Sequence, residues 1–264
     1  MRLFYLQTGA FGFILDFMEE KTLLSKLRRC VADYKMINDG DKIAVGLSGG
    51  KDSVSLLKLL ARFSKFSDVK FTVVAITVDL AFHGVQGDYT RLQALCDELG
   101  VEYIIERTRI GEIVFDVRKE PNPCSLCSRM RKGALYNVAI ANGCNKVALG
   151  HHLDDMTDTF FLSMFYEGRL ATFAPKMKLD KTGIILIRPM LYISEYELKS
   201  FSKTLPVVKS KCPADKKTKR EEIKEIVKLL QTRIPDVKTQ IQTAILNPER
   251  YNLFDKFTND IDKF

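Results

Sequence analysis

The sequence has no internal repeat and no low-complexity linker, which leaves one α/β domain with a helical extension as the organisation that fits 264 residues. It also lacks a long apolar run, because the aromatic and apolar residues 1–17 are too few to span a bilayer. Gln7, Asp16 and the absence of a small-residue cleavage site argue against a signal peptide. We therefore expect a cytoplasmic protein that spans no membrane. Met18 is itself a plausible start, and if residues 1–17 are translated as an extension we expect them to form an extra helix packed on the body.

The six cysteines follow no secretory leader, so a disulfide framework is not expected and metal or redox chemistry is the better interpretation. Cys30, Cys96 and Cys144 stand singly in helix-like or turn segments. We expect these three to be packing residues.

Positive charge is in excess, with 41 Lys plus Arg against 33 Asp plus Glu, a net charge of +8 and a sequence pI of about 9.1. Such a surface favours a polyanionic partner, of which nucleic acid is the first candidate. A solvated lysine-rich surface explains the net charge equally well.

Short apolar strands alternate with segments of helical periodicity along most of the chain. The first group comprises strands at 42–47, 71–78, 101–105 and 146–150, and helices at 22–34, 54–63, 88–99, 125–141 and 154–165. The second group comprises strands at 184–188 and 206–208, a helix that begins at a Ser194 and Glu197 capping box, and helices at 221–233 and 237–246. The alternation predicts the α/β class with a doubly wound, mainly parallel sheet.

Three regions are expected along the chain. They are an N-terminal extension (1–21), the α/β domain (22–208) and a basic helical appendage (209–264). The basic residues that open the appendage are Lys209, Lys211, Lys216, Lys217, Lys219 and Arg220, against the single acid Asp215.

A glycine loop, Ser-Gly-Gly-Lys-Asp-Ser at 48–53, follows the first strand. A strand that runs through glycines into a helix offers free backbone N–H groups and a helix N-terminus, which bind phosphate. Gly49 and Gly50 permit close approach, the flanking serines supply hydroxyl donors, and Lys51 adds positive charge. Two glycines alone would favour a simple turn, but the full hexapeptide in this context favours a phosphate site. Its spacing differs from the G-x-x-x-x-G-K-S/T of NTPases that cut at the γ-phosphate.

Acidic residues follow the strand at 146–150, in the run HHLDDMTD at 151–158. Asp154 and Asp158 lie one helical turn apart with Asp155 beside them, and carboxylates there can hold Mg²⁺ against nucleotide phosphates. Acids in a first helical turn also complement the helix dipole. Three acids behind two histidines exceed what capping needs, so we favour the Mg²⁺ site.

A C-x-x-C pair, Cys124 and Cys127, lies at the start of a helix, and Cys212 stands alone later in the chain. A pair and one distant thiolate make three ligands, which suits a [4Fe–4S] cluster with one open iron. Three alternatives compete with the cluster. A structural zinc ion requires four ligands. A thioredoxin-like dithiol does not require Cys212. A coincidental pair of buried cysteines is not expected between a Pro-rich loop and a basic run.

The loop resembles that of the N-type ATP pyrophosphatases, whose members hold the pyrophosphate and expose the α-phosphate to attack. Together with HHLDD and PCSLCSR, it closely resembles the tRNA 2-thiocytidine synthetase group of tRNA thiolation enzymes, from about residue 22 to residue 246. The resemblance implies the adenine nucleotide alpha-hydrolase-like (PP-loop) fold. It also implies an ATP-dependent tRNA sulfurtransferase that adenylates an anticodon-loop cytidine and replaces the carbonyl oxygen by sulfur, giving 2-thiocytidine.

The resemblance also implies cofactors, partners and site residues. The cofactors are ATP, Mg²⁺ and a [4Fe–4S] cluster, and the partners are tRNA and a sulfur donor, either a cysteine desulfurase persulfide or free sulfide. Members often form a homodimer. The expected catalytic residues are Lys51, Asp52, Asp154 and Asp155. The expected nucleotide-binding residues are Ala44, Ser48, Gly49, Gly50, Lys51, Asp52, Ser53, Thr77, Gly150 and His151. The expected cluster ligands are Cys124, Cys127 and Cys212.

One departure separates this chain from better-known bacterial members, which carry a second C-x-x-C where residues 212–215 read Cys-Pro-Ala-Asp. Two alternatives of other classes stay open. One is a tRNA-adenylating ligase of the lysidine synthetase type, which needs no cluster. The other is a non-catalytic metal-bound RNA-binding protein. In the favoured interpretation, the basic residues of 129–132 and 209–220 form two positive patches around the site.

Overall fold

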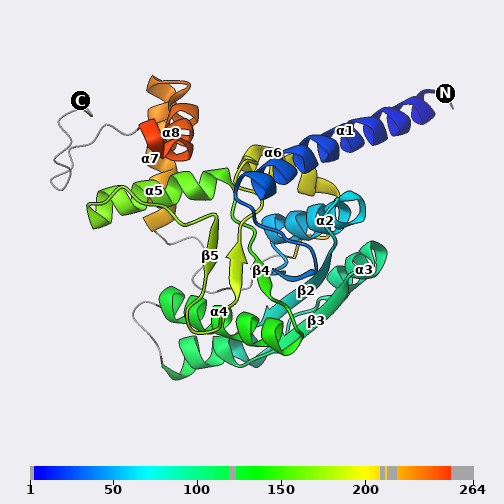
Figure 1. Ribbon diagram of the computed structural model, residues 1–264, viewed down its shortest axis with the longest axis vertical. Coiled ribbons are helices and arrows are strands. Elements are labelled where there is room, and N and C mark those ends of the chain that lie inside the picture. Colours follow the sequence, from blue (N-terminus) through cyan, green and yellow to red (C-terminus); the bar gives the residue numbers. More distant parts are fainter. Residues whose placement is uncertain (1–2, 119–122, 209–211, 213–218, 251–264) are drawn as a thin grey trace. The chain divides into compact units, whose positions relative to one another are not determined.

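The computed structural model describes residues 3–118, 123–208, 212 and 219–250 (Figure 1). The chain divides into two compact units. The first, here called the sheet unit, comprises residues 1–154 and 174–217. The second, the helical unit, comprises 155–173 and 218–264. The three regions expected from the sequence stay a prediction.

The elements of both units alternate as the sequence pattern predicts. The strands are Asp41–Gly46 (β1), Phe71–Asp79 (β2), Glu102–Arg107 (β3), Lys146–Ala148 (β4), Lys176–Lys178 (β5) and Ile185–Ile187 (β6). The helices are Leu3–Asp33 (α1), Lys51–Phe66 (α2), Thr90–Leu99 (α3), Pro123–Ala141 (α4), Leu153–Glu167 (α5), Glu195–Phe201 (α6), Lys219–Arg233 (α7) and Val237–Leu246 (α8). Short helical turns are Phe82–Gly84 (η1), Glu112–Val117 (η2), Ser202–Thr204 (η3) and Pro248–Arg250 (η4).

The strands form one six-stranded sheet in the order β3-β2-β1-β4-β6-β5. The neighbours from β3 to β6 pair in parallel, and β5 pairs antiparallel to β6 at the edge. The chain moves outward from β1 to β3 and then returns to place β4 on the other side of β1. The sheet therefore has its topological switch point between β1 and β4, where α/β sheets bind ligands. The predicted doubly wound, mainly parallel sheet is confirmed.

Two local expectations were wrong. Residues 206–208 form no strand, because the Val208 N–H donates to the Gly49 carbonyl oxygen at 2.8 Å and is not part of a sheet ladder. The edge strand β5 was missed, because its sequence Lys-Met-Lys has neither a β-branched residue nor an apolar run. The helix expected at 22–34 is the second half of the continuous helix α1.

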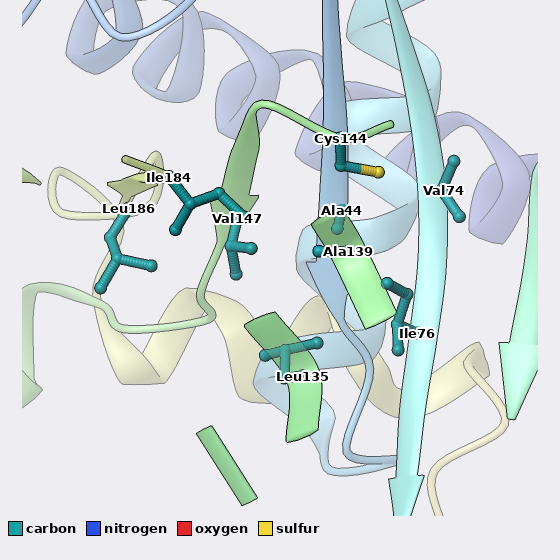
Figure 2. Packing of buried hydrophobic residues seen from close by; sticks show 9 residues of the cluster. All are labelled: Ala44, Val74, Ile76, Leu135, Ala139, Cys144, Val147, Ile184 and Leu186. Carbon is teal, nitrogen blue, oxygen red and sulfur yellow. The ribbon is translucent and has the colours of Figure 1, made fainter. Parts of the chain in front are cut away.

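Helices cover both faces of the sheet (Figure 1). Right-handed crossovers put α2 and α3 on one face, and they put α4 on the opposite face because the chain reverses direction after β3. Helices α1 and α6 pack against α2. Figure 2 shows the core between α4 and the sheet, formed by Ala44, Val74, Ile76, Leu135, Ala139, Cys144, Val147, Ile184 and Leu186.

The helical unit has a small core of its own, in which Phe161 of α5 packs with Ile223 and Val227 of α7. All three side chains are buried. Across the part of the chain that the structure describes, no helix is both long enough and apolar enough to cross a bilayer.

Candidate active site

The glycine loop connects the carboxyl end of β1 to α2. Gly49 has φ +84°, a conformation that L side chains rarely adopt, and a Cβ there would lie 3.0 Å from the Val208 Cβ. The Ser53 hydroxyl donates to the Gly50 carbonyl oxygen at 2.9 Å and accepts from the Ser48 N–H at 3.1 Å. The loop is therefore held in shape by its own serines and by the 206–208 segment.

The N-terminus of α2 is open toward a ligand. Its N-cap residue is Gly50, and no side chain caps the helix. The first N–H groups of a helix have no partner within the helix, and they carry the positive end of its dipole. Loop and helix together therefore offer the anion site that the sequence predicts.

Lys51, the first residue of α2, carries the positive charge of this site. Its Nζ lies 2.8 Å from Asp52 Oδ1 and 3.3 Å from Glu195 Oε1. Burial acts to lower the Lys51 pKa, but the interactions with Asp52 and Glu195 outweigh it and raise that pKa. Lys51 is therefore a fixed cation beside the phosphate site.

Thr77 and Gly150 support the loop from neighbouring segments, whereas Ala44 lies in β1 and belongs to the core. Thr77, fully buried in β2, donates its hydroxyl to the Leu47 carbonyl oxygen at 2.6 Å. Gly150 allows the end of β4 to approach α2, because a Cβ there would lie 3.1 Å from backbone atoms of Asp52 and Ser53. Ala44 is a fully buried member of the core in Figure 2.

The residues that follow β4 connect the loop to α6. His152 is buried, with Nε2 3.8 Å from Asp52 Oδ1 and Nδ1 3.8 Å from Asp154 Oδ2. Asp154, also buried, accepts the Glu195 N–H at 2.7 Å. The carboxylates of Asp52, Asp154 and Glu195 therefore gather around Lys51 and His152. Carboxylate oxygens are the ligands that Mg²⁺ prefers, although within the described ranges these side chains do not stand at metal-binding distances from one another.

Sequence analysis missed Glu195 as a site residue. The only local signal at Glu195 is the capping box of Ser194 and Glu197, which the structure confirms, with the Ser194 Oγ accepting the Glu197 N–H at 3.3 Å. That box predicts where α6 begins but not which residue its first turn approaches.

His151 contacts Arg188, a second residue that the sequence did not single out. The Arg188 Nε–H donates to His151 Nδ1 at 3.2 Å, and Arg188 Nη1 donates to the Ala174 carbonyl oxygen. A guanidinium only donates, so Nδ1 is the acceptor and the ring proton of a neutral His151 sits on Nε2.

Asp155 belongs to the helical unit, where Arg220 of α7 binds it at 2.9 Å. The same guanidinium donates to the Thr159 hydroxyl at 3.3 Å. Lys219 lies over the Tyr166 ring, 4.1 Å from its centroid. These contacts tie α7 to α5, and the role of Asp155 at the nucleotide stays a prediction.

All six cysteines lie in the described part of the chain, and none is in a disulfide. Cys30, Cys96 and Cys144 are buried, as expected for packing residues. Burial raises the pKa of Cys30 and of Cys96 to about 12, which makes both thiols inert.

The remaining three cysteines are accessible and close enough to interact. Cys124 is exposed, and Cys127 and Cys212 are partly exposed. Burial raises the Cys127 pKa, the Arg131 charge opposes this, and the charges of Cys212 and Cys124 raise it further. Cys127 is thus close enough to Cys124 and Cys212 to be affected by both, although among the described residues no three His, Cys, Asp or Glu side chains stand at metal-binding distances. The donor set suits an iron–sulfur cluster.

The fold and the loop define a nucleotide-binding α/β protein with its phosphate site at the switch point between β1 and β4. A family model described as PP-loop domain matches residues 19–230. A protein of Geobacter metallireducens named tRNA-cytidine(32) 2-sulfurtransferase is 36% identical over 92% of this chain and 96% of its own length. The Pelobacter propionicus protein of the same name is 38% identical over 90% of this chain and 91% of its own length. The chain belongs to the family of PP-loop proteins that these relatives represent.

A solved structure also matches. It is the U34-tRNA thiolase NcsA of Methanococcus maripaludis with its [4Fe–4S] cluster, 29% identical with a TM-score of 0.69. The match covers 92% of this chain and 84% of that one. These comparisons confirm the resemblance to the tRNA 2-thiocytidine synthetase group inferred from the three sequence motifs.

Proposed function

We propose that this protein is an ATP-dependent tRNA sulfurtransferase that converts cytidine 32 of tRNA to 2-thiocytidine. One observation carries the proposal: the glycine loop and the three cysteines lie at the carboxyl edge of the same sheet. The loop follows β1, and α4 begins near the end of β3 with Cys124 and Cys127 in its first turns. Relatives named for the reaction at cytidine 32 support the choice of base over a cluster-independent ligase or a non-catalytic RNA-binding protein.

The loop binds the β- and γ-phosphates of ATP in this proposal. The open N-terminus of α2 and the backbone N–H groups of the loop face the pyrophosphate, and Lys51 neutralises the charge that develops as it leaves. Lys51 contacts Asp52 and Glu195. ATP therefore competes with these carboxylates for the lysine.

Mg²⁺ bound to these carboxylates would leave Lys51 available for the phosphates of ATP. We assign Mg²⁺ to the carboxylates of Asp52 and Glu195, which already flank the lysine ammonium, with Asp154 beside them. His152 lies between Asp52 and Asp154, with one ring nitrogen 3.8 Å from a carboxylate oxygen of each. Glu195 thus joins the residues expected at the nucleotide.

Cys124, Cys127 and Cys212 would hold the [4Fe–4S] cluster. A cluster held by three thiolates leaves one iron open to a sulfur ligand, which is the chemistry that it supplies when bound. Arg131, whose charge acts to lower the Cys127 pKa, favours the thiolate form that ligation needs.

The reaction balances with sulfide as the donor. The O2 atom of the cytidine attacks the α-phosphate, an O–P bond forms, and pyrophosphate leaves. Sulfide then bonds to C2, and the C2–O bond breaks with AMP as the leaving group. Oxide alone is a poor leaving group, so adenylation is what makes the exchange possible. A desulfurase persulfide serves as donor once a thiol reductant releases its sulfur as sulfide.

The setting of the reaction follows from its chemistry. We place it in the cytoplasm, where tRNA and ATP are available and exposed cysteines such as Cys124 stay reduced. A homodimer, as the family resemblance implies, remains part of the proposal.

The test is direct detection of the product. Protein purified without oxygen is incubated with unmodified tRNA, ATP, Mg²⁺ and sulfide, and the tRNA is digested and analysed by mass spectrometry. We expect 2-thiocytidine at position 32, with AMP released in equal amount. AMP release that attaches an amine to the base would support the ligase, and no ATP consumption at all would support a non-catalytic RNA-binding protein.

A further inference from the structure

Helix α4 carries cations without acids. Its residues 123–141 include Arg129, Arg131 and Lys132 but no aspartate or glutamate, and none occurs between Glu120 and Asp154. Helix α4 contacts β2, β3, β4 and the turn η2. Strand β4 has no acid, and among the acids of the other elements Asp79 is paired with Arg107 and Glu112 with Arg109. Helix α4 therefore contributes positive charge to this end of the sheet unit and no negative charge.

The packing of α4 on the sheet brings Arg188 close to the cations of this helix. The side chains of Ile184 and Leu186 point toward α4 and share the core with Leu135 (Figure 2). Side chains two residues apart on a strand point to the same face, so Arg188 extends this row toward the carboxyl edge. Helix α4 runs in the opposite direction, and Lys132 lies one turn before Tyr136, which packs against the same core. Lys132 therefore faces Arg188.

The electrostatics agree with this placement. Desolvation, followed by the positive charges of Arg188 and Arg131, lowers the pKa of Lys132. Arg188 itself is 7% exposed, whereas Lys132 and Arg131 are open to solvent. Among the described residues, no carboxylate lies within ion-pairing distance of Lys132 or Arg131. Two accessible cations, Lys132 and Arg131, without an ion-pairing carboxylate favour an anionic ligand.

We propose that Lys132, Arg131 and Arg188 form a binding site for a backbone phosphate of tRNA next to the target nucleotide. Lysine and arginine side chains bind phosphate oxygens through charge-assisted hydrogen bonds, and two of these three are open to an incoming strand. Arg188 also contacts His151 at 3.2 Å, which places the phosphate beside the residues that follow β4.

A tRNA phosphate fits better than a phosphate of ATP. The glycine loop begins α2 on one face of the sheet, whereas Lys132 lies on α4 at the other face, next to the cysteines. The target base has to lie between the glycine loop and the cysteines. The sugar–phosphate backbone of the tRNA next to that base therefore lies at the carboxyl edge of the sheet. This inference rests on the proposed function and names the residues that hold the tRNA there.

Binding measurements on the full-length protein test the site. The probes are unmodified tRNA, followed by fluorescence anisotropy at several salt concentrations, and ATP, followed by calorimetry. The variants are Lys132→Gln and the charge-preserving Lys132→Arg. The matched control is Lys178→Gln, which removes an exposed lysine of β5 in the same unit.

We expect Lys132→Gln to weaken tRNA binding about tenfold, as for a hydrogen bond to a charged group. The slope of log K against log salt should become shallower by about 0.7 to 0.9. Lys132→Arg should stay within about twofold of the unchanged protein, as should Lys178→Gln and the ATP affinity of every variant.

Three outcomes would contradict the proposed phosphate-binding site. The first is a Lys132→Gln variant that matches Lys178→Gln in affinity and slope. The second is a loss of ATP affinity with tRNA binding unchanged, which would assign the cations to the nucleotide. The third is a Lys132→Arg variant as weak as Lys132→Gln, which would point to side-chain shape and not to charge. If the unchanged protein binds no tRNA, the proposed function itself fails.

Discussion

Lys51 in the glycine loop and Glu195 at the start of α6 form an ion pair, with Nζ and Oε1 3.3 Å apart. The two residues lie at opposite ends of the sheet unit's sequence, and the Glu195 N–H is also bound by Asp154 at 2.7 Å. Helix α6 is therefore fastened to the phosphate site by both its backbone and a side chain. A bound phosphate that attracts Lys51 must therefore replace the ion pair between Lys51 and Glu195.

Glu195→Gln should raise the Mg²⁺ concentration needed for half-maximal AMP release about tenfold or more, since the amide removes one charged ligand of the ion. The measurement is tRNA-dependent AMP release over a Mg²⁺ titration. Lys199→Gln is the control, because it removes the exposed partner 3.5 Å from Glu195 and leaves its carboxylate in place. Equal Mg²⁺ curves for all three proteins would contradict the assignment.

Lys51→Ala and Asp52→Ala should each lower the rate of AMP release by about 100-fold or more, as expected when a group that stabilises transition-state charge is lost. Both variants should keep the visible absorption of the cluster, because neither residue touches a cysteine. Ser64→Ala on the same helix is the control, since its hydroxyl bonds only the Ala61 carbonyl oxygen. Wild-type rates in either loop variant would refute the role of the loop.

Replacing Cys124, Cys127 or Cys212 by Ala should abolish both the cluster absorption and the formation of 2-thiocytidine, because three thiolates are the fewest that hold a [4Fe–4S] cluster with one open iron. Pyrophosphate release with tRNA should continue, since adenylation takes place at the phosphate loop, whereas AMP release should be lost together with the sulfur step. The matched controls are the buried cysteines, changed to Ala at 30, 96 and 144. A Cys212→Ala protein with a full cluster and full thiolation would favour zinc or a dithiol.

Lys146→Met should lower the free energy of unfolding by about 3 to 5 kcal/mol. The Lys146 ammonium is 1% exposed, lies 2.6 Å from Asp41 Oδ2 and donates to the Met36 carbonyl oxygen. Its removal leaves the Asp41 carboxylate buried without its cation. Urea unfolding at neutral pH measures the loss, and Lys178→Met is the exposed control.

The same pair predicts a pH dependence. Burial acts to raise the Asp41 pKa, but hydrogen bonds from the Asn38 N–H, Lys146 and Asn145 outweigh it and hold the pKa below the usual value for aspartate. The stabilisation is therefore complete above about pH 4 and is lost as the pH falls through the lower folded value. Asp41→Asn should lack this part of the acid dependence in urea unfolding between pH 5 and pH 3. Parallel curves for the two proteins would contradict it.

Local sequence determined much of this protein. The strand and helix periods, the Ser-Gly-Gly turn and the capping box at Ser194 act within a few residues, so their outcome did not depend on distant parts of the chain. The cysteine pair and the acids after β4 were visible for the same reason. These short-range patterns were sufficient to predict the sheet type, the phosphate loop and the family.

The tertiary structure decided which distant side chains meet. Glu195 reaches Lys51, Arg188 reaches His151, and Val208 bonds the loop at Gly49 only because strand order and helix packing bring these segments together. No spacing within the sequence encodes such contacts, since each depends on the direction in which the chain crosses the sheet after β3. The same crossing places α4 on the face where Leu135 shares a core with Leu186 of β6. It thereby brings Lys132 close enough to Arg188 that the Arg188 charge adds to desolvation in lowering the Lys132 pKa. Residue type was thus a property of the sequence, whereas the neighbours that give each residue its function came from the packing of the sheet.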